Sequence, residues 1–518
     1  MSKKLIVAVV AVWALVLAGG VGIAVVALTR GDDAPKPGAD DTSSSPSAST
    51  QGADGRTIDD FYRQKLTWSD CGANECAELE VPIDYQKPGD GSIKIAVERA
   101  KATGTRVGSL VVNPGGPGAP GTSTVRDAQY YFAGELRAAY DIVGFDPRGT
   151  GKSAPVDCLS DSALDAYVAA DPDPDTPEEV AENEKSSEEF WAGCKARSGT
   201  LAAHVSTVEA ARDMDVLRAA LGEKKLDYLG FSYGTRLGAT YAELYPENTG
   251  RLVLDGAIDP SLSARQGALS QAAGFETALR AYAADCLAAN DCPLSGTVDQ
   301  ALQQIRGVVE QVDARPMSTD GRWLQAGNAF YGLLTPLYSR DTWPMLTSAL
   351  RAVIEEKNGS QLLLLADAYA SRVGGTYLDN SAEAIMAINC LDDPWALTPE
   401  QVPAQMAAFT KASPTFGDAF AWSMTGCLGW QQQAGAKAAD GERVDAAGAP
   451  PIVVVGTTRD PATPYAWSQR LARDLASGVL VTRDGDGHTG LNAGNDCVDT
   501  AVADYLVDGT VPADGLTC

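Results

Sequence analysis

Histidine is almost absent from this chain. Only two of the 518 residues are histidines, His204 and His488. Metal sites built on imidazole therefore have few possible ligands, and the ten cysteines include no C-x-x-C pair of the kind that binds zinc. We expect no metal ion and no other cofactor, and any histidine-dependent chemistry must use one of these two side chains.

Positive charge is scarce as well. The 41 lysines and arginines are outnumbered by 68 aspartates and glutamates, which gives a formal net charge of −27. Such a surface repels phosphate backbones, so nucleic acid is excluded as an expected partner. The acidity suits a surface exposed to the medium and a substrate that carries a positive charge.

Charge is missing altogether from a stretch near the N-terminus. Lys3 and Lys4 precede the 24 uncharged residues 5–28, which at about 1.5 Å per residue span a bilayer core of about 30 Å. The stretch is long for the apolar region of a cleaved signal peptide, and no A-x-A motif ends it. Residues 1–30 are therefore predicted to be a signal or anchor segment, with an uncleaved anchor favoured.

This segment sets the expected location of the protein. Its two lysines place the N-terminus inside the cell and the rest of the chain outside. We expect an extracellular protein, either secreted or anchored to the outer face of the membrane, that meets the membrane through this segment alone. The expected oligomeric state is a monomer.

The next residues, 31–56, are rich in Asp, Ser, Pro, Gly and Ala and are predicted to be a flexible linker. All ten cysteines follow this linker, which agrees with an oxidising compartment. Sequence alone does not fix their connectivity, and pairing neighbours along the chain is the simplest proposal. That proposal gives five disulfides: Cys71–Cys76, Cys158–Cys194, Cys286–Cys292, Cys390–Cys427 and Cys497–Cys518.

The motif that organises the chain is Gly230-Phe-Ser-Tyr-Gly234, which fits G-x-S-x-G. It follows a short apolar run that ends at Leu229 and precedes a helical pattern over residues 237–245. Strand, sharp turn and helix are the context of a nucleophile elbow, where the turn lifts a serine hydroxyl clear of a sheet. We therefore predict that Ser232 is a catalytic nucleophile.

A serine nucleophile needs a base, and on this architecture the triad order is Ser, acid, His. His488 follows Ser232 and lies in a glycine-rich loop after the apolar run 478–482, whereas His204 precedes the serine and is interpreted as structural. The β-branched run 451–456 predicts a buried strand, and Asp460 lies just past its end. Asp460 is the predicted acid, with Asp484 and Asp486 as alternatives that are nearer to His488 along the chain.

The early strands supply a second element of a hydrolase site. Strands are predicted over residues 78–85, 92–99, 108–113 and 140–145. The strand 108–113 is followed by the glycine-proline stretch 114–121. Glycines let amide groups approach a developing oxyanion without obstruction. One donor is expected from this loop, with Gly116 favoured, and the other from the residue after the nucleophile, Tyr233.

The loop 146–153 superficially fits a phosphate-binding loop, because it contains Gly-Thr-Gly-Lys-Ser. The G-x-x-x-x-G-K-[ST] pattern fails at its first glycine, and a structural turn with a buried Asp–Arg pair is the preferred interpretation. After this loop, residues 206–221 predict a helix, with Ser206 and Glu209 spaced as a capping box.

Several of these motifs together resemble the α/β-hydrolase aminopeptidases: Asn113-Pro-Gly-Gly-Pro-Gly118, Asp146-Pro-Arg-Gly-Thr-Gly-Lys-Ser153, Gly230-Phe-Ser-Tyr-Gly-Thr235, and the late Asp460 and His488. More narrowly, the chain resembles the secreted actinobacterial tripeptidyl aminopeptidases and their proline iminopeptidase cousins. Proline iminopeptidases usually carry His-Gly-Gly-Pro-Gly at the oxyanion loop, where this chain has the Asn-Pro-Gly-Gly-Pro-Gly of the tripeptidyl group. The resemblance covers about residues 59–518.

The predicted fold class is therefore α/β, an α/β-hydrolase with a mostly parallel central sheet and helices on both faces. Residues 57–261 and 450–518 are predicted to form the two parts of the core. The span between them is too long for a connection and has helical periodicity, so residues 262–449 are predicted to be an inserted helical cap. The resemblance implies that acidic side chains of the cap hold the ammonium group of the substrate, and the candidates are Glu383, Asp392 and Asp393.

The leading functional prediction is an extracellular serine exopeptidase, of tripeptidyl or prolyl aminopeptidase type, that removes short peptides from free N-termini. A carboxylesterase or lipase-like serine hydrolase is the alternative, because the same triad serves both reactions. A surface binding protein with a dead site is a third hypothesis, and the intact Ser, Asp and His argue against it.

Overall fold

The computed structural model describes residues 53–319, 321–430 and 443–518. The predicted membrane segment, residues 1–30, and nearly all of the predicted linker lie outside these residues. Within the described part of the chain, no helix combines the length and the apolar character needed to cross a membrane.

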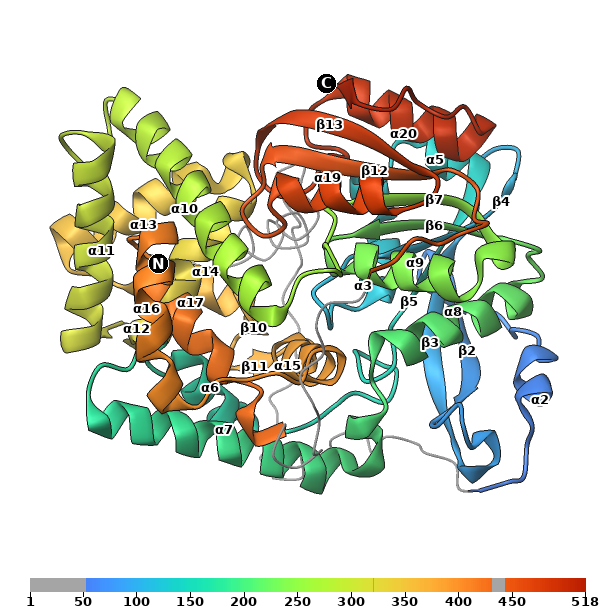
Figure 1. The fold of residues 1–518 in the computed structure, drawn as a ribbon, viewed down its shortest axis with the longest axis horizontal. Coiled ribbons are helices and arrows are strands. Elements are labelled where there is room, and N and C mark those ends of the chain that lie inside the picture. The colour runs from blue at the N-terminus through green and yellow to red at the C-terminus, as the bar shows by residue number, and fades with distance from the viewer. Residues whose placement is uncertain (1–52, 320, 431–442) are drawn as a thin grey trace, which may run out of the picture.

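A ten-stranded sheet runs through the core in the order β1-β2-β3-β5-β4-β6-β7-β12-β13-β14 (Figure 1). The strands β1, β2, β3 and β5 pair in antiparallel fashion, and the sheet is parallel from β5 through β4 to β14. The bounds are β1 Ser69–Cys71, β2 Asn74–Pro82, β3 Ser92–Ala100, β4 Gly108–Asn113, β5 Tyr140–Phe145, β6 Leu226–Phe231, β7 Thr249–Asp255, β12 Ile452–Arg459, β13 Gly478–Asp486 and β14 Leu516–Thr517. The predicted strands and the predicted fold class are confirmed.

Both faces of this sheet are covered, which explains why its inner strands are continuous apolar runs. In β4, Val111 packs into one core while Leu110 and Val112 pack into the core on the other face. The first core is closed by α8 (Thr207–Leu221), α9 (Tyr233–Leu244) and α19 (Tyr465–Asp474). The second is closed by α3 (Gly121–Arg126), α4 (Ala128–Tyr131), α5 (Gly134–Ala139) and α20 (Asp496–Asp508).

The helical insertion lies between β7 and β12, and most of it gathers on one side of the sheet (Figure 1). Its helices are α10 Ala264–Ala288, α11 Val298–Ala314, α12 Ala326–Leu334, α13 Trp343–Glu356, α14 Ser360–Tyr369, α15 Ser381–Asp392, α16 Pro403–Ala412 and α17 Gly417–Trp422. All of them except α15 share an apolar core of their own, separate from the two cores of the sheet. Ala384, Ala387 and Ile388 of α15 pack into the first core of the sheet instead. Periodicity predicts helices over residues 268–289, 298–312, 343–356, 360–370 and 382–389, which correspond to α10, α11, α13, α14 and α15. It does not predict α12, α16 and α17.

Two helices from the first half of the chain join this cap. The helices α6 (Asp161–Ala169) and α7 (Pro177–Ser198) lie between β5 and β6 along the chain. Figure 1 shows them below α12 and α17. Trp191 of α7 donates a hydrogen bond of 2.9 Å from Nε1 to the carbonyl of Gly426. A side chain at Gly327 of α12 would strike the backbone of Ala170 at 2.3 Å. The cap is therefore built from two separate segments of the sequence.

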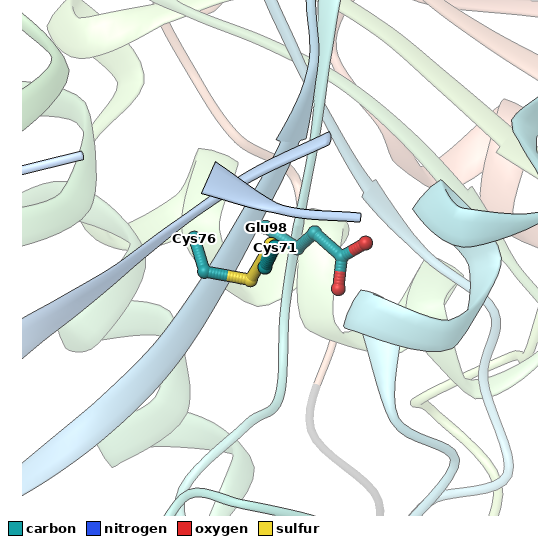
Figure 2. Close-up of side chains that lie close together, drawn as sticks. All are labelled: Cys71, Cys76 and Glu98. Carbon is teal, nitrogen blue, oxygen red and sulfur yellow. A yellow bond between two sulfur atoms is a disulfide. The ribbon is translucent and has the colours of Figure 1, made fainter. Parts of the chain in front are cut away.

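Five disulfides are present, and they join the same cysteines as the neighbour-pairing proposal: Cys71–Cys76, Cys158–Cys194, Cys286–Cys292, Cys390–Cys427 and Cys497–Cys518. Figure 2 shows the first of them, with Glu98 of β3 next to it. The Glu98 carboxylate accepts a hydrogen bond of 2.9 Å from Asn74, the first residue of β2, which lies between the two cysteines along the chain. Because the two sulfur atoms are bonded to each other, they are not thiolate ligands.

The loop 146–153 contributes the arginine of a buried Asp–Arg pair, as predicted, but the aspartate of the pair lies outside the loop. Arg148 is fully buried, and its guanidinium pairs with Asp213 of α8 at 2.7 and 2.8 Å. Asp146 instead accepts hydrogen bonds of 3.0 Å from the amides of Thr122 and Lys152. The loop is structural, as predicted, but its arginine ties the loop to α8 rather than to its own neighbour.

Candidate active site

Ser232 lies in the tight turn between β6 and α9. Its backbone has φ 54° and ψ −123°, a region that is costly for any residue with a side chain and is characteristic of a nucleophile elbow. The flanking glycines are needed for space, because a Cβ atom at Gly230 would lie 2.4 Å from the carbonyl oxygen of Gly234. A Cβ atom at Gly234 would lie 2.8 Å from the carbonyl oxygen of Asn113. The turn therefore requires the glycines of the motif.

His488 and Asp460 come together from the loops that follow β13 and β12. Nδ1 of His488 lies 2.9 Å from each carboxylate oxygen of Asp460. The carboxylate is held in turn by the amides of Ala462, Thr463 and Thr489 at 2.8–3.1 Å. Nε2 of His488 is buried and has no hydrogen-bond partner among the described residues. This arrangement fixes the tautomer and leaves Nε2 available to accept a proton.

The environment of His488 favours its protonated form. Burial alone lowers the pKa of this imidazole, but the charge of Asp460 and its hydrogen bond to Nδ1 outweigh burial and raise the pKa above 6.5. The charge of Asp255 acts in the same direction. A histidine of this kind binds a proton strongly when it takes one from a nucleophile.

The alternative acids, Asp484 and Asp486, are engaged elsewhere. Both contact Arg459, at 3.0 Å for Asp484 and 2.6 Å for Asp486. Neither has a hydrogen bond to His488 among the described residues. His204 precedes Ser232 in the sequence, and its Nδ1 lies 2.8 Å from the carboxylate of Glu209. The structure therefore brings together Asp460 and His488, the pair predicted from the strand ends.

The glycine-proline loop after β4 lies against the elbow. A Cβ atom at Gly115 would be 2.9 Å from Cβ of Ser232 and 3.2 Å from the amide nitrogen of Tyr233. The loop is held by Asn113, which is fully buried and accepts a hydrogen bond of 2.9 Å from the amide of Gly115. No hydrogen bond from the amides of Gly116 or Tyr233 is found within the described ranges. Both amides are thus available to an oxyanion at this place.

Ser232 opens into a cavity of about 630 Å³ under the cap. Gly116 and Pro117 of the loop line it, as do Thr463 and Tyr338, which both touch His488. Its apolar wall is aromatic, and its acidic lining residues are Asp171, Asp259, Asp392 and Asp393. The cavity is therefore large enough for a small organic substrate or a short peptide, and its lining carries four carboxyl groups and one guanidinium group, that of Arg236.

The three acids suggested for the substrate ammonium group have different surroundings. Glu383 does not line the cavity, because its carboxylate accepts two hydrogen bonds of 2.8 Å from the amides of Cys158 and Leu159. Burial raises the pKa of Glu383 to about 7. Glu383 therefore anchors a disulfide-bonded loop and is withdrawn as a substrate ligand.

Asp392 and Asp393 both line the cavity, at the end of α15. Asp392 is engaged by the amide of Thr207 at 2.8 Å, by the Thr207 hydroxyl, and by Arg236 at 4.0 Å. Asp393 has no side-chain partner among the described residues: the amide of Trp395 donates to it at 3.4 Å, and the amide of Ala264 also acts on its carboxylate. Burial raises the pKa of both carboxyls, and Arg236 opposes that rise. Asp393 thus has more capacity left for a ligand.

Comparison with known proteins agrees with this geometry. Residues 108–338 match the alpha/beta hydrolase fold family, and residues 413–518 match the family described as TAP-like protein. The chain is 37% identical over 481 residues to serine protease Hip1 of Mycobacterium tuberculosis, covering 88% of this chain and 91% of Hip1. The chain belongs to the α/β-hydrolases with a TAP-like C-terminal region.

Two further relatives of this α/β-hydrolase carry different names. Carboxylesterase B of Mycobacterium tuberculosis is 37% identical over 454 residues, covering 86% of each chain. Tripeptidyl aminopeptidase of Streptomyces lividans is 32% identical over 474 residues, covering 88% of this chain and 87% of that enzyme. The protein is therefore a serine hydrolase of this family, and its relatives include both peptidases and an esterase.

Several residues of this hydrolase that act at the site through backbone hydrogen bonds are not predicted from its sequence. Asp255 accepts amide hydrogen bonds from the His488 loop, and Asn113 holds the loop of Gly116. The carbonyl of Tyr338 accepts a hydrogen bond of 2.8 Å from the amide of His488. Only Asp255 leaves a signal in the sequence, as a charged residue directly after the apolar run 252–254.

Proposed function

We propose that this protein is an extracellular serine exopeptidase that releases short peptides, with tripeptides favoured, from free N-termini. The observation that carries the proposal is the acid-lined cavity under the cap, into which Ser232 opens and in which Asp393 has capacity for a cation. A free N-terminus is an ammonium group, and a partly buried carboxylate is the group that would select it.

In the proposed mechanism, Ser232 attacks the scissile carbonyl while Nε2 of His488 takes the hydroxyl proton. Asp460 holds Nδ1 and stabilises the imidazolium that forms. The amides of Gly116 and Tyr233 donate hydrogen bonds to the oxyanion of the tetrahedral intermediate. His488 then protonates the leaving amine, and water attacks the acyl-enzyme with His488 as base, which releases the peptide and restores the serine.

The surroundings of the site support an exopeptidase over an enzyme that cuts within long chains. Ser232 opens into a single cavity of about 630 Å³ beneath the inserted helices. A cavity of this size accommodates a few residues, and a closed far end would set how many residues precede the cleaved bond. The names of two relatives, serine protease Hip1 and tripeptidyl aminopeptidase, favour the peptidase assignment.

A carboxylesterase is the second candidate function, and one observation favours it. The cavity wall includes Phe275, Phe330, Tyr338 and Phe420, whose rings contact one another and reach His488. An apolar aromatic wall would suit the acyl chain or the alcohol of an ester as well as an apolar peptide side chain. Carboxylesterase B is as similar to this chain as Hip1 is.

The location and assembly of the enzyme complete the proposal. Five disulfides in the described residues favour folding in an oxidising compartment, which for this chain we take to be outside the cell. The N-terminal residues 1–30 would serve as its signal or membrane anchor. We propose a monomer whose partner is its peptide substrate and whose reaction uses no cofactor.

The proposed ammonium site is tested by Asp393→Asn. The exchange keeps the shape of the side chain and removes its charge, so a free-amine tripeptide amide should lose about 10–100-fold in kcat/KM, mostly through KM. A short-chain ester of the same chromophore should be hydrolysed at the wild-type rate. Steady-state kinetics on both substrates measure the two effects.

Asp171→Asn is the matched control, because Asp171 is another acid that lines the same cavity. We expect this variant to stay within about threefold of wild type on both substrates. An Asp393→Asn variant with wild-type kinetics on the peptide would contradict the assignment. If Asp171→Asn shows the loss instead, the ammonium site lies at Asp171 and the role given to Asp393 is wrong.

A further inference from the structure

Asp255 is the last residue of β7 and is fully buried, with 0% of its surface exposed. Its strand lies between β6, which leads to Ser232, and β12, which leads to Asp460. Phe231 and Val455 are its direct neighbours on these two strands. Asp255 therefore lies between the ends of the two strands that lead to the predicted nucleophile and to its acid.

This residue is hydrogen-bonded to the backbone of Ser232 and to the loop that carries His488. Its backbone carbonyl accepts a hydrogen bond of 2.9 Å from the amide of Ser232. Its carboxylate accepts hydrogen bonds of 2.8 Å from the amides of Gly490 and Leu491, in the loop that begins with His488. The following residue also touches the histidine, since a Cβ atom at Gly256 would lie 3.2 Å from Cε1 of His488.

The carboxylate has no cationic partner within salt-bridge distance among the described side chains. Its oxygens are satisfied by backbone amides alone, and burying a charge in this way is costly. Burial raises the pKa of Asp255 to about 6, and the two amides act against that rise. A neutral side chain could hold a loop at a smaller cost, so the charge itself calls for an explanation.

The groups whose charges act on Asp255 give that explanation. They are Asp460, which follows β12, and Arg483 and His488, which belong to β13 and the loop after it. His488 is the one that gains a proton in the proposed reaction. Because Asp460 already contacts Nδ1 of His488, Asp255 supplies a second negative charge to the same imidazole without touching it.

We propose that Asp255 is a positioning residue that fixes the His488 loop relative to Ser232 and stabilises the imidazolium through its buried charge. The proposal rests on the Ser232–His488 pair of the proposed function but not on the choice of substrate. The hydrogen bonds set the distance between the two loops, and a displacement near 1 Å at a reacting centre costs about 10²-fold in rate. The charge sets how readily His488 accepts a proton.

The test measures the rate at which a fluorophosphonate probe labels the enzyme between pH 5 and 9. This probe reports the reactivity of the serine and needs neither a peptidase nor an esterase cavity. Asp255→Asn keeps an oxygen that can accept from Gly490 and Leu491 but has no charge. Its plateau rate should fall about tenfold, and the acid limb of its pH profile should move to lower pH, because the imidazolium is less stabilised.

Asp255→Ala removes the acceptor as well, and its plateau rate should fall about 100-fold. Asp499→Asn is the matched control, because Asp499 of α20 holds the amide of Asn492 at 2.7 Å in the same loop. It should leave the acid limb in place. Thermal melting establishes that each variant is folded, and Asp255→Ser is the second neutral variant should Asp255→Ala not fold.

Two results would overturn the proposal. If the neutral variants label at the wild-type rate with an unchanged acid limb, Asp255 does not act on the pair. If they are slower but their acid limb stays in place, Asp255 only anchors a loop. Wild-type enzyme that the probe does not label would contradict the proposed function itself, which keeps the two failures apart.

The effect of the Asp255 charge on His488 can also be measured directly, by following the titration of the two histidines by NMR. Histidine labelled with ¹³C at Cε1 gives one signal from His488 and one from His204, and His204 serves as the internal reference. The titration of His488 in Asp255→Asn should move to lower pH than in wild type, and that of His204 should not move. A His488 titration that is unchanged would overturn the proposal.

Discussion

Ser232→Ala should lower kcat by about 10⁶-fold while leaving the fold intact. The loss is of the size seen when the nucleophile of a serine hydrolase triad is removed, because no other group can form the acyl-enzyme. The strained backbone at φ 54° is retained, and alanine tolerates it no worse than serine does. Turnover of any accepted chromogenic substrate, together with thermal melting, measures both parts of the prediction.

Ser187→Ala is the control for this substitution. Ser187 lines the same cavity, and its hydroxyl has no hydrogen-bond partner among the described residues. The control should retain activity close to that of wild type. Residual activity of Ser232→Ala above a few per cent would contradict the assignment of the nucleophile.

Gly115→Ala should cost about 10²–10³-fold in kcat, the size of the loss when one oxyanion donor is removed. The backbone of Gly115 has φ +100°, and an added Cβ atom would lie 2.6 Å from the carbonyl oxygen of Phe231. The backbone strain and the steric clash would both displace the loop from the elbow, and the amide of Gly116 would move with the loop. The affinity for substrate should change much less than kcat, because the oxyanion exists only in the transition state.

Gly307→Ala provides the matched glycine-to-alanine control. Gly307 lies in α11 of the cap, and an added Cβ atom there would meet nothing within 4 Å. The control should keep wild-type kinetics and gain a little stability, since alanine favours a helix. A Gly115→Ala enzyme with kcat within about threefold of wild type would contradict the placement of the oxyanion loop.

Local patterns predict the elements that position the site. The β-branched run at β12 and the apolar run at β13 indicate buried parallel strands, and chemistry requires the acid and base at their carboxyl ends. The scarcity of histidine then leaves His488 as the base. Asp460 and His488 lie together in the structure as those patterns predict.

The contacts that the sequence does not reveal are those between distant segments. Arg148 could be assigned to Asp146 or to any other acid, and only the packing of α8 selects Asp213. Glu383 lies close to Cys390 along the chain, but α15 turns its carboxylate toward Cys158 and away from the cavity. The contribution of α6 and α7 to the cap is likewise hidden in the sequence, because it depends on a hydrogen bond between Trp191 and the distant Gly426.

Asp255 is not recognisable from a sequence motif for the same physical reason. Its function depends on two backbone amides that lie 235 and 236 residues away along the chain. A strand ending in Asp-Gly is a common pattern, and nothing in it specifies which loop the carboxylate will meet. Only the order of the strands in the sheet brings Asp255 between Ser232 and the His488 loop.

The most direct test of the proposed function compares three substrates that carry one chromophore: a tripeptide amide with a free N-terminus, the same amide acetylated, and a short-chain ester. The acetyl group removes the ammonium charge that Asp393 is proposed to bind and changes little else. The account predicts efficient cleavage of the free-amine peptide and a loss of at least about tenfold on acetylation. Cleavage of the ester with both peptides left intact would contradict it, and would make this serine hydrolase an esterase.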